Sequence, residues 1–155
     1  MKKFVKLTFA LMLVVLLTGC LGKNKVTKCT LNSDQSASGY KIKSEYNINS
    51  SGEIVNKVIK IDTVESKNNT ILAYFEKQFK TQYKTNNDKY GGYTYKITNK
   101  GGKVVSEATI DFNKIDLNKF IKDNPAMKSY VNKSNKLTVK DVKSMYQASG
   151  ATCEK

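Results

Sequence analysis

Residues 40–49 read YKIKSEYNIN, and their side chains alternate in character along the whole stretch. One alternating set is mostly apolar and consists of Tyr40, Ile42, Ser44, Tyr46 and Ile48. The intervening residues are all Lys, Glu or Asn. A period of two with one polar face predicts a half-exposed antiparallel strand. Ser50-Ser51-Gly52 supplies a turn, and the Val- and Ile-rich residues 53–65 predict the returning strand of a hairpin.

The returning strand carries an irregularity in its own pattern. Its apolar residues change parity, from Ile54 and Val58 to Ile59 and Ile61. Such a change predicts either a β-bulge or burial on both faces.

The segment after this hairpin predicts an amphipathic helix over residues 71–84. Apolar side chains recur there at the spacing of one helix face, at Leu72, Phe75, Phe79 and Tyr83. Asn69 or Thr70 is the candidate N-cap, because both side chains can accept a backbone hydrogen bond. We therefore expect one helix packed on the sheet.

A second hairpin and helix follow in the same order. Residues 93–98 and 103–112 predict its strands, and residues 117–122 predict a short helix that stops before Asn124-Pro125. The repetition is either a duplicated ββα unit or generic hairpin chemistry. With a short first strand over 26–31 and a last helix over 138–149, the pattern predicts an α+β fold. Its antiparallel sheet is built from two β-hairpin-plus-helix units, with the helices on one face, plus a C-terminal helix.

The N-terminus predicts export and lipidation. Three lysines lie within residues 1–6, residues 7–17 are apolar apart from Thr8, and Leu17-Thr18-Gly19-Cys20 follows. This tetrapeptide resembles the lipobox of bacterial lipoproteins, which implies diacylglyceryl transfer to Cys20 and cleavage before it. An ordinary membrane anchor is the alternative, but a spanning helix needs about 20 apolar residues. The expected organisation is a signal peptide over 1–19, a lipidated tether over 20–28 and a single domain over 29–155.

The charge of the chain is strongly basic. All 27 basic residues are lysine, against 13 acidic residues, and the net charge is +14. Removing residues 1–19 with their three lysines leaves +11. Lysine acts as a hydrated point charge rather than a shaped anion receptor. The excess is therefore either a solvated coat or a means of contacting anionic lipid headgroups or envelope polymers, and we expect no nucleic-acid partner.

Two cysteines, Cys29 and Cys153, remain once Cys20 carries lipid. In an exported domain they are either bridged or two free buried thiols. A bridge would close most of the chain into one loop, which contributes roughly 4–5 kcal/mol in the loop-entropy treatment.

The sequence offers little for catalysis. It has no histidine, which removes the commonest general base and the imidazole metal ligands. A hydrolase that uses carboxylates alone stays open. Asp111-Phe112-Asn113 with Asp116 lacks most of a calcium-loop pattern. We expect no catalytic residue, no metal and no cofactor.

Several of these features together resemble the YehR-like bacterial lipoproteins. They are the lipobox at Cys20, the early Cys29, the repeated hairpin and helix, and the ending Gly150-Ala151-Thr152-Cys153. The resemblance covers nearly the whole mature chain. It implies a shared fold, an extracytoplasmic location and pairing of Cys29 with Cys153, and it brings no catalytic residue.

The expected function is a non-catalytic binding role at the cell envelope, by a lipoprotein attached to the outer face of the cell membrane through Cys20. Anionic envelope polymers or another envelope protein are the expected partners. The alternative is a small-molecule-binding accessory lipoprotein with a tyrosine-lined pocket. Its candidate lining residues are Tyr40, Tyr46, Tyr93 and Tyr95.

Overall fold

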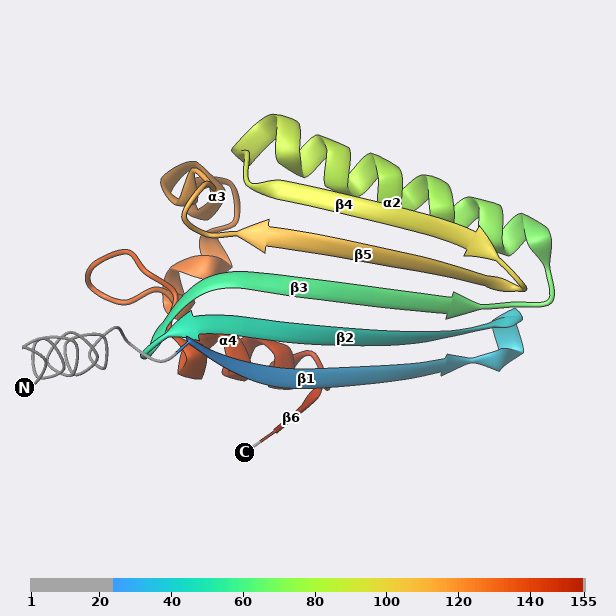
Figure 1. The fold of residues 1–155 in the computed structure, drawn as a ribbon, viewed down its shortest axis with the longest axis horizontal. Coiled ribbons are helices and arrows are strands. Elements are labelled where there is room, and N and C mark those ends of the chain that lie inside the picture. The colour runs from blue at the N-terminus through green and yellow to red at the C-terminus, as the bar shows by residue number, and fades with distance from the viewer. Residues whose placement is uncertain (1–23, 155) are drawn as a thin grey trace, which may run out of the picture.

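The computed structural model describes residues 24–154 and has the predicted α+β architecture (Figure 1). Six antiparallel strands form one sheet in the order β4-β5-β3-β2-β1-β6. The strands are β1 (Asn24–Gln35), β2 (Tyr40–Ser51), β3 (Ile54–Glu65), β4 (Tyr93–Lys100), β5 (Lys103–Asp111) and β6 (Thr152–Cys153). The helices are η2 (Ser36–Ser38), α2 (Asn69–Tyr90), α3 (Leu117–Asp123), η3 (Pro125–Tyr130) and α4 (Val139–Ala148).

The two predicted hairpins, β2–β3 and β4–β5, join through β3 and β5 at the centre of the sheet. The parity change from Val58 to Ile59 reflects apolar residues on both faces, since Ile59 and Ile61 are half-buried on the face opposite Val58. β3 also contains a bulge, two residues before Val58. Asn49 pairs with Lys57 and Ser50 with Val55, so Asn56 is the extra residue. Because of this extra residue, Val55 and Val58 both face the core.

Two apolar cores lie on the same face of the sheet. The first contains Val64, Val104 and Ala108 from the sheet and Leu72 and Phe79 from α2. The second lies under α4 and contains a separate set, with Tyr46, Ile48, Val55 and Val58 from the sheet and Val142 from the helix. The opposite face carries no helix among residues 24–154.

Two elements are longer than the sequence predicts. β1 pairs with β2 from Asn24 to Gln35, so residues 24–28, expected to be tether, belong to the sheet. The part of the expected tether that precedes the sheet is residues 20–23. α2 begins after Asn68, whose side chain accepts from the backbone N–H of Thr70, and it continues to the buried Tyr90.

Within residues 24–154, no helix is long and apolar enough to cross a membrane.

Candidate functional site

The two ends of the sheet carry different features (Figure 1). β1 begins at Asn24 beside Ser51 of β2, and α3 and the segment before α4 lie at this end. We call it the proximal end, because the chain before Asn24 joins the sheet here. The distal end holds η2, the link from β3 to α2 and the turn between β4 and β5. The 12 residues of β1 separate the two ends by about 40 Å.

A cleft of about 550 Å³ lies at the distal end, and we call it the distal cleft. It is lined by Ser36, Gly39, Tyr40, Lys41, Glu65, Ser66, Lys67, Gly101, Gly102 and Lys103. Ser66 connects the walls of the cleft through two hydrogen bonds. Its hydroxyl donates to the carbonyl oxygen of Gly39 at 2.7 Å, and its backbone N–H donates to the carbonyl oxygen of Gly102 at 3.1 Å.

The charges of the distal cleft are mixed but mainly positive. Lys103 contacts Glu65 at 2.6 Å, and Lys41 contacts Asp34 at 3.1 Å. The hydrogen bond from Lys103 lowers the pKa of the Glu65 carboxyl, so this pair is ionised at neutral pH. Lys67 has no ion-pair partner within the described part of the chain. The cleft thus offers ionic contacts at an exposed surface.

The four tyrosines proposed as a pocket lining do not share one site. Tyr40 lines the distal cleft and packs edge-to-face on Phe75, with ring centroids 5.0 Å apart. Tyr46 is buried against Tyr146, and Tyr95 is 40% exposed on the edge strand.

Tyr93 lines a separate apolar cavity of about 110 Å³ under α4, beside Phe112 and Val142. That volume is well below the roughly 300–1,000 Å³ of a typical ligand pocket.

A buried ionic cluster lies between the two cores. Asp62 is 2% exposed and contacts the ammonium of Lys60 at 2.8 Å. Ser44 donates to the same carboxylate at 2.6 Å, and Tyr83 of α2 donates to it at 3.3 Å. The hydroxyl of Ser106, opposite Asp62 on β5, is buried without a hydrogen-bond partner among the described residues.

The ionic cluster shifts the pKa of two of its members. Burial has the largest single effect and lowers the pKa of Lys60, but the charge and hydrogen bond of Asp62 and the neighbouring tyrosines together outweigh burial, so the net pKa is raised. Burial raises the pKa of Tyr83 to about 12. Sequence reasoning missed this cluster, although Ser44 and Asp62 both stand at core positions of alternating strands. Its closed surroundings make it a structural centre rather than a binding site.

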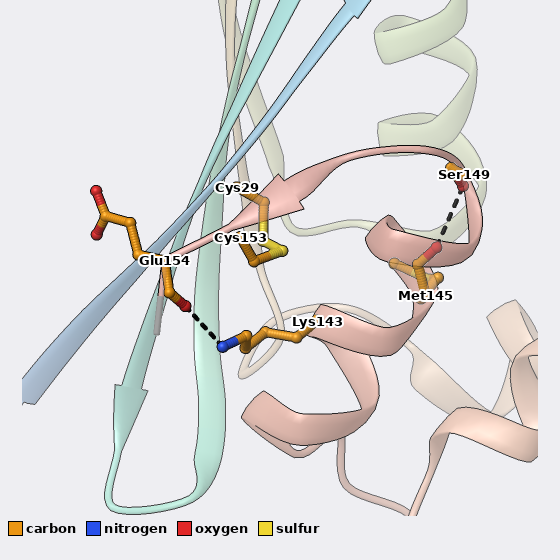
Figure 2. The surroundings of a disulfide bond; sticks show 6 residues. All are labelled: Cys29, Lys143, Met145, Ser149, Cys153 and Glu154. Atoms are coloured by element: carbon orange, nitrogen blue, oxygen red, sulfur yellow. Dashed lines mark hydrogen bonds between the residues drawn. A yellow bond between two sulfur atoms is a disulfide. The ribbon is translucent and has the colours of Figure 1, made fainter.

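A disulfide joins Cys29 of β1 to Cys153 of β6 (Figure 2). Cys29 is buried, and the two cysteines are register partners in the sheet. The chain after the bond is fastened to the same region. The backbone N–H of Glu154 donates to the carbonyl oxygen of Lys28 at 2.8 Å. Lys143 of α4 donates to the carbonyl oxygen of Glu154 at 2.7 Å (Figure 2). The disulfide therefore holds the C-terminal segment and α4 onto the edge of the sheet.

The remaining predicted site residues have other surroundings. Cys20 lies outside the described residues. Asp111 and Asp116 serve the local backbone, since they accept from the N–H groups of Asn113 and Lys119. No group of three potential metal-binding side chains occurs within residues 24–154.

The sequence matches no known protein-family description, and no curated protein matches it in sequence. Its fold does have solved counterparts. The NMR structure of Escherichia coli YehR superposes with a TM-score of 0.55 at 17% identity, covering 85% of this chain and 91% of that one. The NMR structure of a protein from Streptococcus pneumoniae TIGR4 gives a TM-score of 0.49 at 15% identity, covering 85% and 87%. The chain therefore has a YehR-like fold, and the likeness extends to the fold alone.

We predict that reduction destabilises the domain strongly. The cysteines are separated by 124 positions, so opening the bond frees a loop that contributes roughly 4–5 kcal/mol. Urea unfolding of residues 21–155 with and without dithiothreitol measures this loss. The Cys29→Ala/Cys153→Ala variant is the control, because its urea unfolding midpoint should not change with the reductant. Equal midpoints for the oxidised and reduced parent chain would contradict the prediction.

We also predict a loss of stability at alkaline pH that depends on Tyr83. Its pKa is raised from 10.0 to about 12 in the folded state, so the folded chain keeps a proton that the unfolded chain releases. The contribution of Tyr83 to the free energy of unfolding is therefore fully present below pH 10 and is lost as the pH rises toward 12. Urea unfolding at pH 9 and at pH ~11.5 should show the parent losing about 2 kcal/mol more than Tyr83→Phe. The same pH dependence in both chains would rule out this assignment.

Proposed function

We propose that the chain is a non-catalytic binding lipoprotein, held to the extracytoplasmic face of the cell membrane by lipid on Cys20. Its distal cleft would engage an anionic envelope polymer or another envelope protein. One observation carries the proposal: the cleft lies at the end of the sheet opposite the end that the chain from Cys20 joins.

The anchor is supported by the distance in sequence between the lipobox and the fold. Cys20 precedes the first residue of β1, Asn24, by four positions. Four extended residues reach at most about 14 Å. A lipid on Cys20 would hold the proximal end near the membrane and direct the distal cleft outward.

The chemistry of the distal cleft supports binding of an anionic partner. Lys41, Lys67 and Lys103 line it against a single acidic residue, Glu65. The ion pair of Glu65 with Lys103 is exposed, so a polyanion can compete for the lysine at small cost. Lysines without a shaped fork suit repeated, diffuse anionic groups better than one defined phosphate.

A small-molecule-binding role is the second candidate, at the same cleft. Its volume of about 550 Å³ suits a metabolite, and the ring of Tyr40 supplies an apolar wall. A ligand held mainly by that ring would bind with little dependence on salt.

The lipid anchor predicts in which cell fraction the variant Cys20→Ala is found. Cys20→Ala should move the chain from the membrane fraction to an unprocessed or soluble form, because the thiol that accepts the lipid is gone. Fractionation with immunoblotting, and labelling with a radioactive fatty acid, measure both effects. Full membrane retention of Cys20→Ala would exclude the lipid anchor.

The distal cleft predicts salt-sensitive binding of residues 21–155 to isolated cell walls that retain their anionic polymers. Lys67→Gln/Lys103→Gln should weaken this binding by about 10-fold, at less than about 1 kcal/mol per exposed charge contact. Lys77→Gln/Lys96→Gln removes the same charge elsewhere and is the matched control. Binding that survives removal of the polymers, or equal effects of both variants, would contradict a polymer site in the cleft. A salt-insensitive melting shift with one compound would instead favour the small-molecule role.

A further inference from the structure

The segment from α3 to the start of α4 is strongly basic. Residues 117–140 contain six lysines and one acidic residue, Asp123. We call these lysines the basic rim: Lys119, Lys122, Lys128, Lys133, Lys136 and Lys140. All six are exposed. The segment lies at the proximal end of the sheet, where β1 begins (Figure 1).

The lysines of the basic rim have no ion-pair partner within residues 24–154. Acidic residues near the rim are engaged otherwise. Asp123 pairs with Lys89 of α2, Asp116 caps α3, and Asp141 accepts from the Thr138 hydroxyl at the start of α4. The distal end differs, since Lys41 and Lys103 are paired with acids there. All six lysines of the basic rim thus lack an ion-pair partner within residues 24–154, whereas Lys67 alone does so among the three lysines that line the distal cleft.

The basic rim is held in place by the fold. Leu137 is 2% exposed, and its carbonyl oxygen accepts from the backbone N–H of Val55 at 3.0 Å. The side chain of Asn132 accepts from the N–H groups of Ser134 and Lys136 at 2.9 and 3.0 Å, which closes a tight loop. Lys133 and Lys136 therefore project from a loop with a defined backbone.

The described chain begins at this same surface. Asn24 and the exposed Lys25 begin β1 at the proximal end, and the exposed Lys57 follows the nearby turn. A lipidated Cys20 would lie at most about 14 Å from Asn24. An anionic bilayer attracts basic side chains within about one Debye length, about 8 Å at physiological salt.

We propose that the basic rim is a membrane-docking surface that contacts anionic lipid headgroups. The proposal rests on the lipid anchor at Cys20 for its geometry in the cell, but the surface itself is a property of the folded domain. A lipid on Cys20 would attach the domain to the bilayer at one point, whereas a basic surface supplies a second contact that restrains the orientation of the domain. The rim would hold the sheet upright, with the distal cleft about 40 Å from the bilayer.

Vesicle binding of residues 21–155 tests the surface without the anchor, because both cores and the disulfide lie within residues 24–154. Vesicles of phosphatidylglycerol mixed with phosphatidylcholine should bind the domain, and pure phosphatidylcholine should not. Each lysine near such a surface contributes about five-fold, so Lys128→Gln/Lys133→Gln/Lys136→Gln should weaken binding on the order of 100-fold. The matched control is Lys77→Gln/Lys96→Gln/Lys100→Gln, which should retain binding within a few-fold.

The orientation is tested by a single tryptophan, since the chain has none. Ser134→Trp on the rim loop should be quenched by lipids with nitroxide headgroups, and Thr98→Trp near the distal end should not. Equal quenching at both positions, or equal weakening by both lysine triples, would overturn the proposal. So would a rim triple that loses binding to polymer-bearing walls but keeps its binding to vesicles. Failure of the anchor shows instead as membrane retention of Cys20→Ala, which these assays do not use.

Discussion

The buried carboxylate of Asp62 constrains how the layers of this domain fit together. A carboxylate at 2% exposure is tolerated only when its oxygens are paired and hydrogen-bonded. Its partners come from three elements: Ser44 on β2, Lys60 on β3 and Tyr83 on α2. The hydrogen bond from Tyr83 to Asp62 forms only when the face of α2 that carries Tyr83 is turned toward the sheet. Lys60 also lies 5.9 Å from the ring centre of Tyr46, which stacks on Tyr146 of α4, so the ionic cluster connects the two cores.

The disulfide stabilises the edge of the sheet formed by β1 and β6. α4 covers the second core, and the short β6 joins the C-terminal end of α4 to the edge of the sheet. The bond between Cys29 and Cys153 fixes that edge covalently, beside the hydrogen bond of Lys143 to Glu154. The face without helices stays solvated because its strands carry charges of alternating sign. At the distal end the row runs Lys103, Glu65, Lys41 and Asp34 across four strands. Neighbouring charges in this row pair with one another at the exposed surface, and Lys67 beside the row has no ion-pair partner within residues 24–154.

The sequence predicts the architecture because alternation along β2 and helical spacing along α2 are local signals. The parity change in β3 was visible for the same reason and reflects apolar residues on both faces, whereas no pattern in the sequence predicts the bulge at Asn56. The ends of β1 were missed because its polar residues at both ends pair with β2 through backbone groups that any side chain allows. The distal cleft could not be predicted, because Ser66 joins Gly39 to Gly102 from three separate turns. The four tyrosines looked alike on their strands, and only the packing of α2 and α4 separates their surroundings.

The distance between the two ends of the domain follows from the backbone itself. β1, β2 and β3 each contain 12 residues and pair with one another over nearly their whole length. A hydrogen-bonded strand cannot shorten or lengthen without breaking its ladder, so about 40 Å between the ends is fixed rather than set by a flexible linker. In the proposed arrangement, the four residues from Cys20 to the sheet would add little freedom to that distance. In the proposed arrangement, the distal cleft would meet its partner at one height above the membrane, and only tilt would change that height. Tilt is the motion that a basic rim on anionic lipid would restrict.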